Sequence, residues 1–392
     1  MYLKTLHLRE FRNYRDRQVE FGAPKTILVG DNAQGKSNLL EGAALLSTLK
    51  SHRSTSDRDL IREGAELGQA TGIVDRQIAP VELSVTLRRT GRRTLTVDGQ
   101  GCRRQLDFLG IFNVVEFSSL DLDLVRGSPE SRRHWLDGLV VQLEPFYAHL
   151  LKQYDRVLRQ RNALLRKIRE SFSPMANRTD PSQQMSDSAL PVLDAQLATL
   201  GTKVMRRRSR AIERLTPIAR AWHDAIGGGA EQLSIRYASN ISLFHPSAIR
   251  EEPEVVRQGF LDLIREKAIA EYHRGTTLVG PHRDEIAFSI NETPARQYAS
   301  QGQQRTLVLA LKLAQLKLIE EVVGEPPVLL LDDVLAELDP NRQNQLLEAI
   351  EDRFQTLITT THLGAFDAQW LKTSQILGVR AGEICSQGDF SP

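Results

Sequence analysis

Residues 30–37 of this 392-residue chain read Gly30-Asp31-Asn32-Ala33-Gln34-Gly35-Lys36-Ser37. A β-branched run, 26–29, leads into them, and an apolar helical pattern, 39–49, follows them. Glycines at this spacing between a strand and a helix form the phosphate-binding P-loop pattern, in which backbone amides and the start of the helix attract phosphate oxygens. The pattern predicts an ATP site, with Lys36 at the β- and γ-phosphates and Ser37 on Mg²⁺. A glycine-rich turn that binds nothing is the alternative interpretation.

An acidic partner for that metal stands far along the sequence. Residues 328–331 are a continuous apolar run, which is typical of a strand buried on both faces. Asp332 and Asp333 follow this run directly. We expect Asp332 to coordinate Mg²⁺ through water and Asp333 to orient or deprotonate the attacking water, so both join Lys36 as catalytic candidates. Taken alone, two acidic residues could equally cap the end of a strand.

Three further segments stand in a fixed order around this strand. They are Ser300-Gln301-Gly302-Gln303-Gln304 before an apolar helical pattern, Ala336-Glu337-Leu338-Asp339, and Thr361-His362. A Ser and a Gly ahead of a helix can bind an anion, although an ordinary helix cap is the alternative interpretation. Together with the P-loop, this order resembles that of the ABC-type ATPases, with Gln301 where their signature has its first Gly.

That resemblance implies an α/β ATPase head whose site is shared between two subunits. In the family, the P-loop of one subunit faces the signature of the other across ATP, so an ATP-dependent two-fold homodimer is implied. Ser300, Gly302 and Gln303 would then contact the partner's nucleotide, Asp339 would lie in the D-loop, and His362 would be the switch histidine. A kinase of small molecules would leave the signature and the D-loop without a role.

The middle of the chain differs from the rest in charge and in hydrophobic period. The whole sequence has 51 Lys or Arg and 49 Asp or Glu, but residues 151–220 hold 15 and 6. Apolar residues recur every three or four positions in 143–172 and 193–226, which predicts two long amphipathic helices. The polar run 173–190 between them predicts a flexible tip. The sequence therefore predicts a basic helical hairpin.

This insertion separates Ser37 from Ser300 much farther than a transporter subunit of the ABC type would. We expect a P-loop ATPase head made of residues 1–120 and 276–392, with the helical arm, 121–275, between its two halves. The organisation resembles Rad50 and the SMC proteins, and the chain most closely resembles the RecF family over nearly its whole length. The matching segments are 8–14, 122–129, 132–137, 280–284 and 329–346.

Resemblance to the RecF family implies a task in DNA repair. It implies binding to DNA at gaps and single-strand/double-strand boundaries, RecR and RecO as protein partners, help in RecA loading and SOS induction, and a weak DNA-stimulated ATPase. An SMC-like structural DNA clamp with incidental ATPase activity is the alternative function.

Two departures from the pattern limit what is carried over. Ser119-Leu120 stands where the family has Pro-Glu, so no Q-loop residue is assigned. Asp333 is shorter than the glutamate that most ABC ATPases carry, although an aspartate is usual in the RecF family. The hypothesis is that the shorter carboxylate slows hydrolysis, as in a timed switch.

Several basic residues are candidates for DNA phosphate contacts. They are Lys50, Arg53, Lys203, Arg206, Arg207 and Arg208. A solvated helix face is the alternative interpretation. Arg12 and Asn13 are predicted to approach the nucleotide base or its phosphates. Two cysteines, and the lack of any apolar stretch long enough to span a membrane, favour the cytoplasm and no membrane partner.

Overall fold

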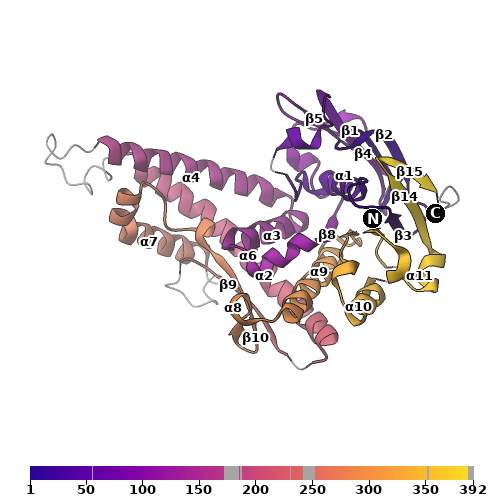
Figure 1. Ribbon diagram of the computed structural model, residues 1–392. Coiled ribbons are helices and arrows are strands. Elements are labelled where there is room, and N and C mark those ends of the chain that lie inside the picture. The colour runs from indigo at the N-terminus through magenta and orange to yellow at the C-terminus, as the bar shows by residue number, and fades with distance from the viewer. Residues whose placement is uncertain are drawn as a thin grey trace. The chain divides into compact units, whose positions relative to one another are not determined.

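Two structural units share the chain, and neither is continuous in sequence (Figure 1). The computed structural model describes residues 1–54, 56–171, 185, 188–229, 231–241, 252–350 and 353–386. Unit 1 comprises Met1–Asp123, Ile218–Gln232 and Ala299–Pro392. Unit 2 comprises Leu124–Pro217 and Leu233–Tyr298.

The strand before the P-loop lies inside a six-stranded sheet of unit 1, with the order β15-β14-β3-β13-β12-β8. The strands are β3 (Lys25–Val29), β8 (Val114–Ser118), β12 (Val328–Asp332), β13 (Thr356–Thr360), β14 (Ser374–Arg380) and β15 (Glu383–Ser386). All but β15 pair in parallel. The apolar residues of β12 are buried, as the sequence predicted. Because parallel strands end at one edge, the P-loop and the carboxylates after β12 lie at the same edge of the sheet.

A second six-stranded sheet of unit 1 has the order β2-β1-β4-β5-β6-β7, and all its neighbours are antiparallel. Its strands are β1 (Tyr2–Phe11), β2 (Tyr14–Glu20), β4 (Leu67–Asp75), β5 (Val81–Arg88), β6 (Thr94–Val97) and β7 (Gln100–Gly101). Helix α1 (Lys36–Thr48) contacts strands of both sheets. It is therefore buried nearly all round, which explains its apolar composition.

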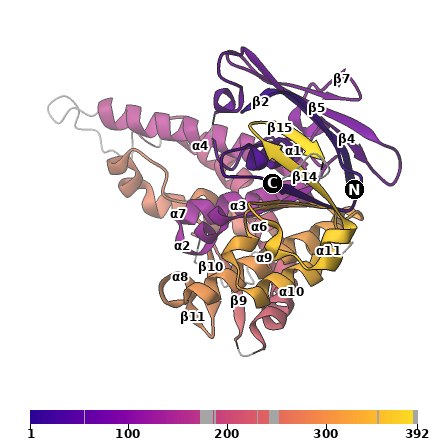
Figure 2. The same ribbon diagram turned by 45° about the vertical axis from the view of Figure 1, so that its right-hand side comes forward.

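The other helices of unit 1 lie across the central sheet from α1 (Figure 2). They are α9 (Gln301–Val323), α10 (Pro340–Ile350) and α11 (Ala368–Thr373). Short 3₁₀ turns connect the elements: η1 (Asp57–Leu60), η2 (Gln105–Asp107), η3 (Ser119–Leu122), η6 (Leu335–Glu337) and η7 (Leu363–Ala365). Helix α9 packs on β8, η3 and α10, and it ends at Gly324 in the left-handed conformation.

Unit 2 contains the two long helices that the apolar period predicted, α4 (Phe146–Ser171) and α6 (Leu190–Gly227). It adds α2 (Asp123–Arg126), α3 (Pro129–Leu143), α7 (Pro253–Arg274), α8 (Ala295–Tyr298) and η5 (Pro281–Arg283). A three-stranded sheet, β11-β10-β9, is formed by β9 (Leu233–Ala238), β10 (Glu285–Ile290) and β11 (Thr293–Pro294). Helix α4 packs on α3 and α7, and α3 packs on β10, so the insertion is more than a hairpin.

The unit boundaries differ from those expected for the head and the arm. Residues 276–298 belong to unit 2, because β10 pairs with β9 over its whole length, from Glu285 to Ile290. The end of α6 and the segment after it, 218–232, belong to unit 1. The predicted flexible tip, 173–190, lies outside the described residues except at 185 and 188–190. Within the described part of the chain, no helix is long and apolar enough to cross a bilayer.

Candidate nucleotide site

The P-loop turns its lysine onto its own backbone. Lys36 is only 4% exposed, and its Nζ donates to the carbonyl oxygens of Gly30 at 2.8 Å and Asp31 at 2.9 Å. A Cβ on Gly30 would lie 2.2 Å from the carbonyl oxygen of Val379 in β14, and Gly35 has a φ of +118°. Both glycines are therefore required by the backbone. The ammonium lies where it can exchange the two carbonyls for phosphate oxygens.

The loop is held from outside by two turns of the surrounding strands. Asn13, between β1 and β2, donates Nδ2 to the Gln34 carbonyl at 3.0 Å and accepts from Asn38 Nδ2 at 2.8 Å. From the β14–β15 turn, the Gly382 amide donates to the same carbonyl at 2.9 Å, and the Ala381 amide donates to Gln34 Oε1 at 2.7 Å. Asn13 and Gln34 thus brace the loop, which leaves Asp31, Asn32 and Ala33 exposed.

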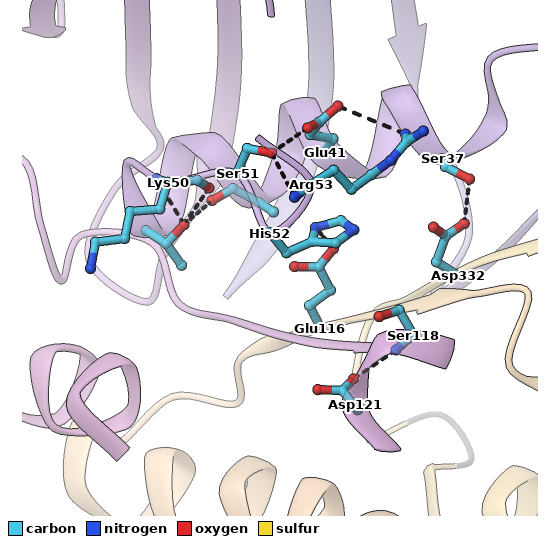
Figure 3. A network of polar contacts seen from close by, with 12 residues as sticks. Ser37, Glu41, Lys50, Ser51, His52, Arg53, Glu116, Ser118, Asp121 and Asp332 are labelled. Atoms are coloured by element: carbon cyan, nitrogen blue, oxygen red, sulfur yellow. Dashed lines mark hydrogen bonds and ion pairs between the residues drawn. The ribbon is translucent and has the colours of Figure 1, made fainter. Parts of the chain in front are cut away.

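Arg12 is engaged with a buried carboxylate. Glu41 of α1 is fully buried, and Arg12 donates Nε and Nη2 to its two oxygens at 2.8 Å each. Ser51 Oγ donates to Glu41 at 2.5 Å, as Figure 3 shows. Burial acts to raise the pKa of Glu41, but the hydrogen bonds from Arg12 and Ser51 outweigh it and hold that pKa below its usual value. The guanidinium predicted to face the nucleotide faces Glu41 and the Asp59 carbonyl.

The two halves of the chain meet at one hydrogen bond. Ser37 Oγ donates to Asp332 Oδ1 at 2.7 Å, although 295 positions separate these residues (Figure 3). Thr359 Oγ1 donates to the same oxygen at 2.8 Å and accepts from the Asp333 amide at 2.9 Å, a role that nothing in its sequence context signals.

This pair of side chains fits a magnesium ion. A hydroxyl and a carboxylate oxygen in contact are the hard ligands that Mg²⁺ prefers. Among the described residues, no group of three His, Cys, Asp or Glu could hold a metal. The ion would therefore take its remaining ligands from water and phosphate.

Asp333 is poised as a base at the same sheet edge. Burial raises the pKa of Asp333, with Lys36 opposing this change and Asp332 adding to it. Its φ is +54°, which is unusual for a residue other than Gly and is consistent with a functional constraint. His362 follows β13 and is exposed, and Thr360 Oγ1 donates to its carbonyl at 2.8 Å.

The signature segment and the D-loop are joined by one arginine. Ser300 caps α9, and its Oγ accepts from the Gln303 amide at 3.2 Å. Arg342 donates Nη2 to the Gly302 carbonyl at 3.2 Å and forms an ion pair with Asp339. The Arg342 hydrogen bond holds the pKa of Asp339 below its usual value. The sequence pattern missed Arg342, although its place one helical turn after Asp339 is a signal for such a pair.

The turn after β8, where no Q-loop residue is assigned, is tied to two elements. His52 Nδ1 lies 2.5 Å from Glu116 Oε1, and Asp121 Oδ2 accepts from the Ser118 amide at 2.8 Å (Figure 3). Lys312 of α9 donates Nζ to the Glu116 carbonyl at 2.6 Å and lies 2.5 Å from Asp121 Oδ1. Burial acts to lower the pKa of His52, but Glu116 outweighs it and raises that pKa. The turn thus links α9 to the loop after α1.

The predicted phosphate contacts divide into exposed and occupied side chains. Those with exposed or partly exposed side chains are Lys50, Arg53, Lys203 and Arg206. Arg207 pairs with Glu144 at 2.8 Å.

Arg208 was wrongly predicted as a phosphate contact. It is 4% exposed, and its Nε and Nη2 donate to Asp137 at 2.8 Å. Contact with phosphate would leave the Asp137 carboxylate unpaired in the interior, which is costly.

Comparisons with known proteins agree with this geometry. The family model described as RecF/RecN/SMC N terminal domain matches residues 2–384. The chain is 64% identical over 384 residues to the DNA replication and repair protein RecF of Nostoc punctiforme, covering 98% of this chain and 99% of that protein. It is 61% identical over 391 residues to the protein of that name from Trichodesmium erythraeum, with both chains fully covered.

Solved structures are similar as well. The recombination mediator protein RecF-ATP in the RecFOR pathway has a TM-score of 0.86 at 30% identity, covering 98% of this chain and 97% of that one. An Smc head bound to the C-winged helix domain of ScpA has a TM-score of 0.53 at 16% identity, covering 99% and 98% of the two chains. This second likeness is one of fold alone.

Proposed function

The chain belongs to the RecF/RecN/SMC N-terminal domain family of ABC-type ATPases, and on that premise we propose that it is an ATP-dependent DNA-binding switch of recombinational repair and replication-fork maintenance. The hydrogen bond between Ser37 and Asp332 carries the proposal, because it joins the P-loop and the acidic strand end into one site. Unit 1 therefore holds the cis half of an ATPase.

In this site each side chain has a separate task. Lys36 binds the β- and γ-phosphates in place of its loop carbonyls. Ser37 and Asp332 would hold Mg²⁺, which neutralises phosphate charge when it is bound. Asp333 accepts the proton of the attacking water, and its raised pKa suits that role. As an aspartate it is one methylene shorter than a glutamate, so the proton acceptor sits farther back and hydrolysis is slow.

The trans half of the site requires a second copy of the chain. Ser300, Gly302 and Asp339 lie together through Arg342 and face the partner's nucleotide, so ATP closes a two-fold homodimer. Dimerisation creates the surface that binds gapped or single-strand/double-strand DNA in the cytoplasm. The RecFOR pathway named for the solved relative supports RecR and RecO as partners, with RecA loading and SOS induction as the outcome.

Light scattering with and without ATP and Mg²⁺, followed by fluorescence anisotropy on gapped DNA, tests the proposal. Wild-type protein should dimerise and bind DNA only with ATP. Lys36→Met should stay monomeric, whereas Lys372→Met, which removes an exposed lysine of α11, should behave as wild type. If Lys36→Met binds DNA as tightly as wild type with ATP, the protein is a structural clamp and the coupled switch is refuted.

A further inference from the structure

The segment that follows α6 contacts the signature segment through a single carboxylate. Gln303 donates Nε2 to Glu231 Oε1 at 2.7 Å, and both residues belong to unit 1. Glu231 lies outside every motif of the sequence, in a segment expected to be part of the arm. Its side chain is about one quarter exposed, so it sits at the edge of the structure and not in the core.

The other end of the Gln303 side chain is also occupied. Its Oε1 accepts from the Ser300 amide at 2.7 Å, while its own backbone amide donates to Ser300 Oγ at 3.2 Å. The two residues therefore form a reciprocal capping box at the start of α9. Ser300 Oγ already accepts one hydrogen bond, so its own proton remains available for a phosphate oxygen.

Glu231 determines which way the Gln303 amide points. A carboxylate accepts hydrogen bonds and donates none, so it binds the NH₂ end of the amide and repels the oxygen end. With the NH₂ held at Glu231, Oε1 must point to the Ser300 amide, which is the orientation that completes the box. The reversed amide would place two oxygens together at Glu231 and two donors together at Ser300.

A histidine lies behind this carboxylate without neutralising it. His223 of α6 is fully buried, and its Nε2 is 3.8 Å from Glu231 Oε2, beyond hydrogen-bond distance. Burial lowers the pKa of His223, so the ring is neutral at neutral pH. Glu231 therefore keeps its full charge for Gln303, and a hydrogen bond to a charged group is a strong one.

We infer that Glu231 is a positioning residue for the trans half of the ATP site, because it sets the orientation of Gln303 and thereby the presentation of Ser300 to a partner's nucleotide. The inference rests on the proposed function. It assigns Glu231 no contact with the nucleotide of its own subunit. Loss of Glu231 should therefore weaken ATP-driven dimerisation and leave ATP binding by the monomer unchanged.

Glu231→Ala is the first test, with Glu231→Gln and Glu63→Ala as matched variants. For the alanine variant, the dimer dissociation constant in ATP, from light scattering, should rise about tenfold or more, as expected when a hydrogen bond to a charged group is removed. Affinity for a fluorescent ATP analogue, measured below the dimerisation concentration, should not change. The glutamine variant keeps an acceptor oxygen and should recover most of the loss. Glu63 is exposed elsewhere in unit 1 and should be neutral.

A mixing experiment separates positioning in trans from general damage. Glu231→Ala retains its cis site, and Lys36→Met retains its signature, so a mixed dimer holds one complete site. ATP turnover of the mixture should exceed that of either variant alone. The inference is overturned if the mixture is no better than its parts, or if Glu231→Ala dimerises like wild type. Failure of wild type itself to dimerise with ATP would instead refute the proposed function.

Discussion

Replacement of Asn13 by alanine should loosen the P-loop before any nucleotide binds. The change removes two hydrogen bonds, to the Gln34 carbonyl and from the Asn38 side chain. Each contributes about 0.5–1.5 kcal/mol, so local opening of the loop should become easier by about 1–3 kcal/mol. That energy corresponds to amide exchange about 5–150 times faster when exchange proceeds through local opening. The side chain also fills the space beside Gly35, where an added Cβ would lie 2.5 Å from Asn13 Nδ2.

Hydrogen exchange of peptides covering residues 30–38, measured by mass spectrometry in ATP-free protein, is the appropriate assay. Asn341→Ala, at an exposed position of α10, is the matched control and should leave these peptides unchanged. If Asn13→Ala weakens ATP binding while exchange in the ATP-free loop stays at the wild-type rate, Asn13 contacts the nucleotide. The bracing role drawn from its hydrogen bonds would then be refuted.

Three other outcomes are expected. Asp333→Glu should raise ATP turnover, by up to about 10²-fold, since the longer carboxylate reaches the water; equal or lower turnover would contradict the explanation for slow hydrolysis. Neutralising Lys203 and Arg206 together should reduce the slope of log affinity against log salt for duplex DNA by about 0.9 for each DNA phosphate that the variant no longer neutralises, and an unchanged slope would remove them from the DNA surface. Burial lowers the pKa of His282 to about 4, so stability falls as pH drops from 6.5 to 4, while burial raises the pKa of Asp284 to about 6, so stability falls as pH rises from 4 to 6. The two effects offset each other, so the urea midpoint of wild type should be nearly flat between pH 4.5 and 6, whereas that of Asp284→Asn should fall on acidification, by about 3 kcal/mol if fully expressed.

The nucleotide motifs were predictable because their chemistry is local in sequence. The P-loop needs glycines and a lysine within eight positions, and a buried strand that ends in Asp332 announces itself by composition. Their meeting across the central sheet followed from the rule that parallel strands end at one edge.

The supporting contacts were not predictable in the same way. The bond between Arg12 and Glu41, and that between Glu231 and Gln303, join residues whose spacing follows no local rule. Glu41 nevertheless carries a signal, since one carboxylate in an apolar helix needs a buried partner. Only the pairing of distant strands brings that partner to it.

Arg208 shows a signal that was present but outweighed by charge. It lies four positions after Val204 and three before Ala211, on the apolar stripe of its helix. Period alone therefore placed it inside, whereas the basic cluster around it suggested the surface. The buried Asp137 settles the conflict, and nothing near Arg208 in sequence announces that partner.

The position of β3 has a consequence for biosynthesis. The strand is translated among the first thirty residues, but its neighbours in the sheet, β13 and β14, are translated near the end of the chain. Until then both edges of β3 lack their partners, and the carbonyl of Val379 that packs against Gly30 has not been made. Unpaired strand edges are templates for aggregation, so the nascent chain carries this hazard through most of its synthesis. A ribosome that stalls before Ser374 releases a product with every P-loop residue and no P-loop.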